Sequence, residues 1–254
     1  MNKRIKMFTG TSGWSYDHWK EHFYPADLNK KEWFPYYTKY YNTVELNMSF
    51  YRYPFPNILK GWKNKMPDDF KMTLKANRQI THYKKFHEVE DDLKKFYNMT
   101  ANLDDNLGCI LFQTPPSFQC DEGNFRVMLK FMDLLDHSLK NVIEFRHSSW
   151  WNEDVIKLLK AHKVGFCNVS GLGMPSDVNI TADFGYFRFH GPDKPYASEY
   201  SEEQLYIWSD KISKTAKQNS LKEIYCYFNN DYFGFALKNA RRMEELLEEK
   251  LSMA

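Results

Sequence analysis

Two charged residues interrupt an otherwise apolar segment in the middle of the chain, VIEFRHSSW, at Val142–Trp150. Glu144 and Arg146 are two positions apart, and side chains two apart on a strand point to the same face. One face of the predicted strand is therefore apolar, and the other ends in an acid and a base. Burial of a charge costs several kcal/mol unless the charge is paired, hydrogen-bonded or wet. The pattern predicts either a mutually satisfied pair or a wet functional site, and we expect the wet site.

Other predicted strands carry polar residues on one face in the same way, in VELN, KMTLKAN, ILFQT and FRFH. The polar residues expected to converge are Glu45, Asn47, Lys75, Gln113, Glu144, Arg146, Arg188, His190 and Asn229. We assign catalytic roles to Glu45, Lys75, Glu144 and His190, with the glutamates as general acid or base. The remaining members of the set are predicted to bind substrate. Because the cations outnumber the glutamates, the set favours an anionic ligand such as phosphate or carboxylate.

Aromatic residues follow several of these strands and would lie over the site. Most of them should pack the loops onto the rim, because Trp and Tyr are commonly partly buried. Tyr51 and Trp150 are the two that we predict to contact a ligand, where a flat ring stacks on a sugar or a base.

Strand-like segments alternate with helical patterns along the whole chain. The predicted strands are Met7–Thr11, Thr43–Asn47, Phe70–Asn77, Leu107–Thr114, Asn141–His147, Val164–Ser170, Tyr186–Gly191 and Glu223–Asn230. Ser201 and Gln204 resemble a capping box, and a last helix begins near Phe235. Eight such units predict an α/β fold with a single (β/α)8 TIM-like barrel domain over residues 1–254. The crossover between the sixth and seventh strands has no helical stripe and is predicted to be a loop.

A doubly wound open sheet is the rival architecture. Its central strands are covered by helices on both faces and read as continuous apolar runs. Here one face is apolar and the other becomes polar near the strand ends, as expected for a barrel lumen that opens into a site at its C-terminal mouth. The alternation therefore favours the barrel.

The composition of the chain limits the functional classes to which the protein could belong. The net charge is +2, and basic residues occur only as scattered pairs, which is no signature of a nucleic-acid-binding protein. No long apolar run suggests a membrane span, and the start MNKRIKMFTG has no apolar stretch typical of a signal peptide. Cys109, Cys167 and Cys226 are predicted to be buried free thiols, which fits the cytoplasm. We expect no cofactor; a divalent metal on Glu45, Glu144 and His190 is disfavoured by the adjacent cations.

Six stretches make the chain recognisable when they are taken together. They are GTSGWSYDHW, TVELNMSFYRYP, LGCILFQTPPSF, VIEFRHSSW, YFRFHG and YFNND followed by Asn239 and Ala240. In this order the chain resembles the YecE-like family, domain of unknown function seventy-two, over nearly its whole length. The resemblance implies a TIM barrel whose mouth carries the polar set above apart from Asn47, and it supplies no established reaction. It also implies a distant likeness to barrel sugar isomerases and to a metal-containing endonuclease, which is analogy alone.

Three hypotheses for function follow. The leading one is an enzyme that hydrolyses or isomerises a phosphorylated or otherwise anionic, sugar-like substrate at the barrel mouth. The alternatives are a nucleic-acid-binding protein or nuclease that uses the aromatic loops, and a noncatalytic binder of a small ligand. The sequence leaves the choice of reaction and the oligomeric state open.

Overall fold

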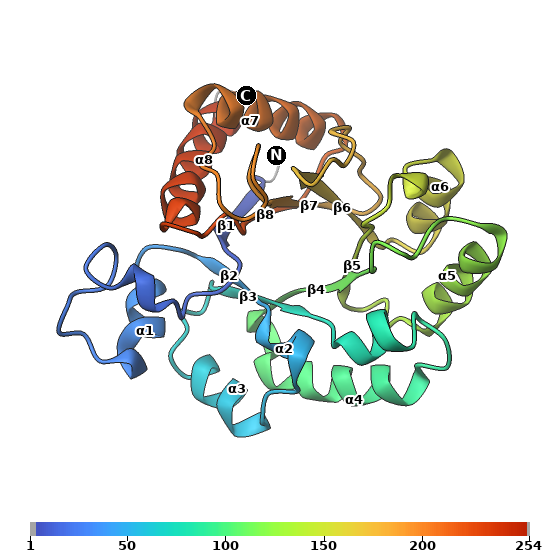
Figure 1. Ribbon diagram of the computed structural model, residues 1–254, viewed down its shortest axis with the longest axis horizontal. Coiled ribbons are helices and arrows are strands. Elements are labelled where there is room, and N and C mark those ends of the chain that lie inside the picture. Colours follow the sequence, from blue (N-terminus) through green and yellow to red (C-terminus); the bar gives the residue numbers. More distant parts are fainter. Residues whose placement is uncertain (1–3, 253–254) are drawn as a thin grey trace.

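Eight parallel strands close into a barrel in the computed structural model, which describes residues 4–252 (Figure 1). The first three residues of the basic N-terminal stretch lie outside the described residues. The strands are β1 Lys6–Thr11, β2 Thr43–Leu46, β3 Lys71–Lys75, β4 Leu107–Gln113, β5 Lys140–Glu144, β6 Gly165–Ser170, β7 Phe184–Phe189 and β8 Glu223–Phe228. Each strand pairs with the next in sequence, and β8 pairs with β1. The predicted TIM-like barrel is confirmed.

The helices lie around the outside of the strands (Figure 1). They are α1 Trp33–Tyr37, α2 Met48–Tyr51, α3 Pro56–Lys63, α4 Glu90–Thr100, α5 Glu122–Leu134, α6 Glu153–Ala161, α7 Glu202–Gln218 and α8 Phe235–Ser252. The capping box of Ser201 and Gln204 starts α7, as predicted. Residues 171–183, between β6 and β7, contain no helix, so the predicted loop at this crossover is also confirmed.

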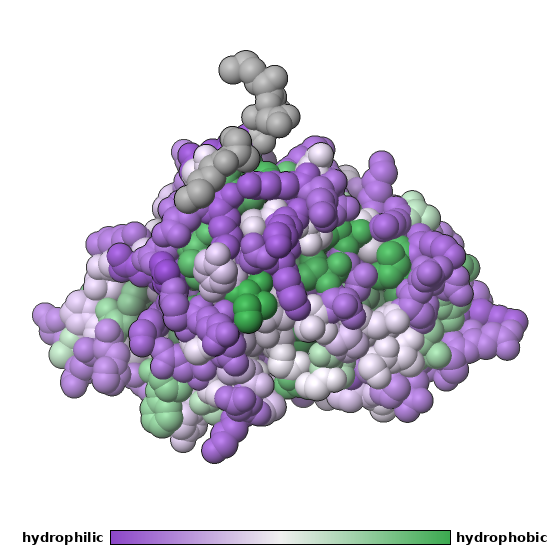
Figure 2. Space-filling model, turned by 90° about the horizontal axis from the view of Figure 1, so that it is seen from above, coloured by the Kyte–Doolittle hydropathy of each residue, from purple (hydrophilic) through white to green (hydrophobic). Residues whose placement is uncertain are grey.

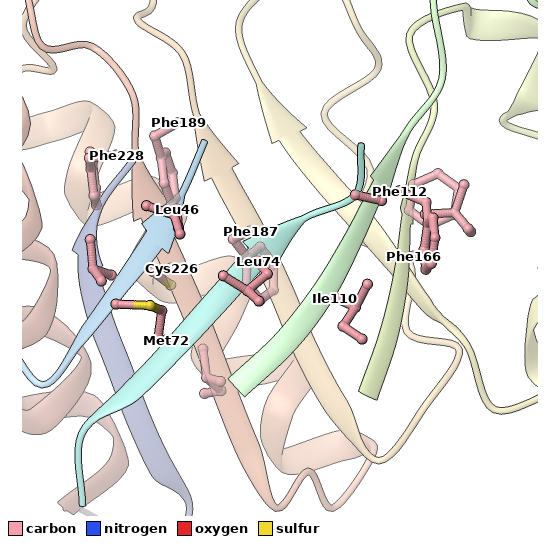
Figure 3. Close-up of a cluster of buried hydrophobic side chains, with 14 of the residues drawn as sticks. Leu46, Met72, Leu74, Ile110, Phe112, Phe166, Phe187, Phe189, Cys226 and Phe228 are labelled. Atoms are coloured by element: carbon pink, nitrogen blue, oxygen red, sulfur yellow. The ribbon is translucent and has the colours of Figure 1, made fainter. Parts of the chain in front are cut away.

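The larger core lies between the strands and the helices. Figure 3 shows side chains on the outer face of the strands, among them Leu46, Met72, Leu74, Phe187 and Phe189. Leu74 and Phe189 are fully buried there. Their immediate neighbours in sequence, Lys75 and Arg188, belong to the opposite face, because successive side chains on a strand alternate. The strand parity inferred from the sequence is therefore correct.

A second, smaller core fills the lumen of the barrel. It consists of Phe8, Cys109, Leu111, Val142, Cys167, Val169, Phe184, Tyr186, Tyr225 and Tyr227. The Tyr227 hydroxyl lies 2.7 Å from that of Thr43 on β2 and 2.8 Å from that of Thr73 on β3, so the buried phenol has polar partners. Cys109, Cys167 and Cys226 are buried free thiols, as predicted. The lumen is a packed floor on which the polar residues of the mouth rest.

One face of the molecule is mainly polar. Figure 2 shows this face, on which hydrophilic residues surround several separate hydrophobic patches. Within residues 4–252, none of the helices is both long and apolar enough to span a membrane.

Candidate functional site

Arg188 stands at the centre of the polar set. It lies on β7, two residues after Tyr186 of the lumen floor, and points to the same face. Its Nη2 donates to Glu45 Oε1 at 2.6 Å, and its Nη1 donates to Glu144 Oε2 at 2.5 Å. The guanidinium thus joins carboxylates from β2 and β5 across the barrel. Its Nε has no hydrogen-bond partner among the described residues, although it is buried.

Glu45 is held by two hydroxyl groups as well as by Arg188. Ser12 Oγ donates to Glu45 Oε1 at 2.8 Å, and the Tyr186 hydroxyl donates to Glu45 Oε2 at 2.6 Å. Neither Ser12 nor Tyr186 belonged to the predicted set. A signal for Tyr186 was present, since it precedes Arg188 by two residues on one strand face. Both residues are part of the site.

Arg146 extends the network from Glu144 toward solvent. Its Nε donates to Glu144 Oε1, and its Nη2 donates to Gln113 Oε1 at 3.2 Å. The Tyr196 hydroxyl, from the segment after β7, lies 3.4 Å from Nη1. The register of β4 and β5 pairs Gln113 with Glu144, which brings the amide to this position. Arg146 keeps 11% of its side chain exposed, and its two terminal nitrogens make only long hydrogen bonds.

His190 follows β7 and completes the buried group. Its Nε2 lies 3.4 Å from Glu144 Oε1, and its Nδ1 lies 3.2 Å from the Asn229 amide nitrogen. The next residue, Gly191, has a φ of +99°, a left-handed conformation that glycine adopts without strain. Burial, reinforced by Arg188, lowers the pKa of His190 to about 3, so the imidazole is neutral at pH 7.

The carboxylates are buried, which corrects the expectation of a wet pair. Glu45, Glu144 and His190 have no exposed surface, and Arg188 is 1% exposed. Burial alone would raise the pKa of Glu144, but Arg146 and Arg188 outweigh it and hold that pKa well below its usual range. Glu144 therefore stays ionised and is a weak base. The carboxylate of Glu144 is thus engaged by two arginines, and its role as general acid or base stays a prediction.

Lys75 is the exception among these charges. It ends β3 on the lumen face and is only partly exposed. Its ammonium lies 4.2 Å from the centre of the Phe50 ring, and no carboxylate lies within 4.0 Å of it in the part of the chain that the structure describes. Burial, reinforced by Arg188, lowers the pKa of Lys75 to about 7.

His82, which lies in the segment after β3, is also influenced by the positive charges of the mouth. Its ring packs edge-on against Phe50 with centroids 4.8 Å apart. Burial, followed by the charges of Lys75 and Arg146, lowers the pKa of His82 to about 4. Lys75 and Arg146 are thus close enough to His82 to disfavour its protonation.

A cleft of about 580 Å³ lies beside the mouth on the β1 and β2 side. Asn47 lines it, and the side-chain oxygen of Asn47 is buried without a hydrogen-bond partner among the described residues. Ser12, which donates to Glu45, also lines the cleft, so the cleft borders the network. The side chains that give it aromatic walls and a basic rim are Trp14, Tyr16, Phe34, Trp62, Lys30, Lys31 and Lys65.

The two predicted aromatic contacts have different outcomes. Tyr51 lies at the end of α2 and is 63% exposed, so it is open to a ligand. Trp150 is fully buried and stacks between Phe118 and Phe145, with its indole nitrogen donating to the Phe118 carbonyl at 2.6 Å. The predicted ligand contact of Trp150 is incompatible with this position, because no part of its ring reaches the surface.

The acidic and histidine side chains that the structure describes do not form a ligand set for a metal ion. Among residues 4–252, no three or more His, Cys, Asp or Glu side chains are grouped to hold a metal ion. Glu45 and Glu144 instead direct their oxygens at Arg188, which competes with any dication.

Comparison with known proteins settles the family. Residues 8–254 match the family described as "Protein of unknown function DUF72". This chain belongs to the DUF72 family. It is 25% identical over 284 residues to the UPF0759 protein YunF of Bacillus subtilis, covering 97% of this chain and 96% of the relative. The UPF0759 protein YecE of Escherichia coli K12 is 25% identical over 115 residues, which cover 45% of this chain and 42% of YecE.

Solved structures of DUF72 proteins share the whole barrel. The crystal structure of a DUF72 family protein (TM1631) from Thermotoga maritima superposes with a TM-score of 0.86 at 30% identity, covering 96% of this chain and 99% of that one. A DUF72 family protein (EF0366) from Enterococcus faecalis gives a TM-score of 0.80 at 19% identity, covering 98% and 99%, and supports the fold alone. The resemblance stated from the six sequence stretches is thereby confirmed.

Proposed function

We propose that this DUF72 protein is an enzyme that binds a phosphorylated or otherwise anionic, sugar-like substrate at the C-terminal mouth of its barrel and hydrolyses or isomerises it. The observation that carries the proposal is that the negatively charged side chains of the mouth are buried more deeply than two of its positively charged ones. The carboxylates of Glu45 and Glu144 are buried, whereas Lys75 and Arg146 are partly exposed above them. A ligand entering the mouth meets cations first, and charge-assisted hydrogen bonds to an anion are among the strongest available.

The cleft beside the mouth supports the sugar-like part of the substrate. Its aromatic walls suit the flat apolar face of a sugar ring, and the unpartnered oxygen of Asn47 suits a hydroxyl donor. Lys31 on its rim adds a further cation for a charged substituent.

Lys75 is the residue of this site that would act as the general acid or base. A group exchanges protons most effectively when its pKa lies near the working pH, and the Lys75 pKa of about 7 meets that condition. Glu144 keeps Arg146 and Arg188 in place rather than exchanging protons, because its own pKa is held low. Arg146 and Lys75 would also stabilise negative charge that develops on the substrate.

Anion titration tests the proposal. We expect inorganic phosphate and glucose 6-phosphate to raise the melting temperature of the wild type, with binding weakened about tenfold or more in Lys75→Met and Arg146→Met, since each loses a charge-assisted hydrogen bond. Lys71→Met is the matched control: Lys71 begins β3, whereas Lys75 ends it, and its ammonium donates to the Asp105 carbonyl. Equal binding by all four proteins contradicts the proposal.

Turnover is measured separately, as phosphate release or isomer formation from a panel of sugar phosphates. Activity that disappears in Lys75→Met supports an enzyme. Stabilisation by these ligands without turnover of any of them favours the noncatalytic binder.

Exposed aromatic rings favour nucleic acid as a second candidate. They follow the carboxyl ends of β2, β3, β7 and β8, and they are Tyr51, Tyr83, Tyr196, Tyr232 and Phe233. The Arg78 guanidinium lies 5.8 Å from the Tyr51 ring and 5.3 Å from the Tyr83 ring. Such rings and cations bind single strands by stacking and charge. Binding of a labelled oligonucleotide should then fall steeply with salt, by a slope of about −0.7 per phosphate contacted; a flat salt dependence excludes this candidate.

A further inference from the structure

Lys75 differs from the other cations of the mouth in what surrounds its nitrogen. Arg188 and Arg146 are each bound to Glu144, whereas Lys75 contacts the face of the Phe50 ring and has no carboxylate within 4.0 Å among residues 4–252. The face of an aromatic ring attracts an ammonium group only weakly, and it forms no hydrogen bond with the lone pair of a neutral amine. The residue is partly exposed at the mouth, and the chemistry inferred below requires that a substrate atom reach its nitrogen.

We infer that Lys75 is a nucleophile that forms an imine with the aldehyde or ketone carbonyl of an anionic substrate, whose charged group is held by Arg146. This inference rests on the proposed function and narrows its substrate class to carbonyl compounds, including sugars in their open-chain form. A desolvated amine close to other cations is the usual way in which a protein activates a lysine for this chemistry.

The step balances without any oxidant or reductant. The neutral Lys75 nitrogen attacks the carbonyl carbon with its lone pair, the π electrons move to the oxygen, and one proton passes from the nitrogen to that oxygen through solvent, which gives the neutral carbinolamine. The carbinolamine hydroxyl takes up a second proton from solvent and leaves as water with the electrons of the carbon–oxygen bond, while the nitrogen lone pair forms the carbon–nitrogen double bond. The product is a protonated imine, and loss of its remaining N–H proton to solvent returns the proton that left with the water. In its protonated form the imine withdraws electrons from the neighbouring carbon and thereby makes the adjacent C–H bond easier to break.

The surroundings suit a neutral amine and an anionic substrate together. Arg146 Nη1 and Nη2 make hydrogen bonds of 3.2–3.5 Å that a carboxylate or phosphate would replace with shorter ones. The pKa of Lys75, lowered to about 7 by burial and Arg188, leaves about half of the amine neutral at pH 7. An ordinary lysine, with a pKa of about 10.4, is neutral in fewer than about one molecule in a thousand at that pH.

Reductive trapping on the wild type tests the inference. D-glyceraldehyde 3-phosphate is the probe because it carries an aldehyde and a phosphate, sodium cyanoborohydride reduces any imine, and peptide mass spectrometry locates the label. We expect Lys75 to be labelled at least about tenfold faster than Lys71, since about half of the Lys75 amine is neutral at pH 7 and the phosphate of the probe is bound by Arg146. The Lys75 rate should fall as the pH drops below about 7, and inorganic phosphate should slow it while leaving Lys71 unaffected.

Two results separate this inference from the proposed function. Lys75 labelled no faster than Lys71, in a protein that still binds phosphate, overturns the imine and leaves anion binding intact. Fast labelling that phosphate does not slow leaves a reactive lysine but overturns the role of Arg146 and the anionic substrate. Lys75→Arg serves as the variant, because it removes the nucleophilic amine: it should lose the fast label, whereas Lys71→Arg, at the start of β3, should keep it. A fast label that persists in Lys75→Arg places the reaction on another residue and overturns the imine.

Discussion

Replacement of Arg188 by methionine tests the central feature of the site, a single cation between two buried carboxylates. Arg188 is 1% exposed and lies 2.6 Å from Glu45 and 2.5 Å from Glu144. Removal of one partner from a buried ion pair costs about 3–5 kcal/mol, because the charge left behind has no compensation. Glu144 keeps Arg146, whereas Glu45 keeps only the hydroxyls of Ser12 and Tyr186. We therefore expect Arg188→Met to lower the free energy of unfolding by about 3–5 kcal/mol, mainly through Glu45.

The loss of stability in Arg188→Met should depend on pH. In the wild type the pKa of Glu144 is depressed, so its contribution to stability is present above the unfolded pKa and is lost as the pH falls through the folded value. In Arg188→Met, Glu144 keeps only Arg146 against the same burial, so its pKa rises. Less of the variant's stability is then lost as the pH falls, so its deficit relative to the wild type should shrink between about pH 7 and about pH 4.

Urea unfolding at these two pH values measures the difference. Addition of Glu45→Gln to Arg188→Met should restore part of the stability, because the neutral amide removes the uncompensated charge. Arg241→Met is the control: Arg241 is 73% exposed, 3.7 Å from Glu245, and such a surface pair contributes less than about 1 kcal/mol. A deficit below about 1 kcal/mol for Arg188→Met, or one that stays constant with pH, would refute the reasoning.

Further predictions concern packing and Lys75. Leu74→Ala and Phe189→Ala, each fully buried against the helix layer, should each lose about 2–5 kcal/mol in urea unfolding, and near-wild-type midpoints would contradict their placement. Trp150→Ala should lose about 3–5 kcal/mol while phosphate affinity stays within twofold of the wild type; a large loss of affinity in a folded variant would return Trp150 to the site. Because the folded pKa of Lys75 lies below that of the unfolded chain, the wild type should gain stability relative to Lys75→Met as the pH rises from about 7 to about 10. An unchanged difference would show that the pKa of Lys75 is ordinary.

The barrel and the membership of its inner face were readable from the sequence. Strand periodicity is local: a side chain faces its neighbour two residues along, whatever the rest of the chain does. Leu74 and Phe189 were therefore assigned to the helix side, and Lys75 and Arg188 to the lumen, without knowledge of the partners. The capping box at Ser201 is equally local, since its two hydrogen bonds join residues three apart.

The ends of the strands were less predictable. The polar alternation runs past Glu144 to Arg146 and past Arg188 to His190, but β5 ends at Glu144 and β7 at Phe189. Pairing with a neighbouring strand defines the end of a strand, and a periodic sequence carries no record of where that neighbour stops. Beyond the last paired residue of a strand, the alternation of side chains no longer predicts the direction in which a side chain points. Trp150 was expected in the mouth because it follows β5, and it turned instead into the core beside Phe118.

The sequence by itself determined that acids and bases share the lumen face of this DUF72 barrel. Which of them pair, and how deep they lie, was decided only by closure of the barrel. Arg188 bridges glutamates that are 143 and 44 residues away in the chain, and Lys75 is left without a carboxylate partner among the described residues. Burial of Glu144, and with it a low pKa rather than that of a useful base, follows from segments distant in sequence that cover it. Electrostatic energy depends on distance in space and on exclusion of water, and neither quantity is a property of residue spacing along the chain.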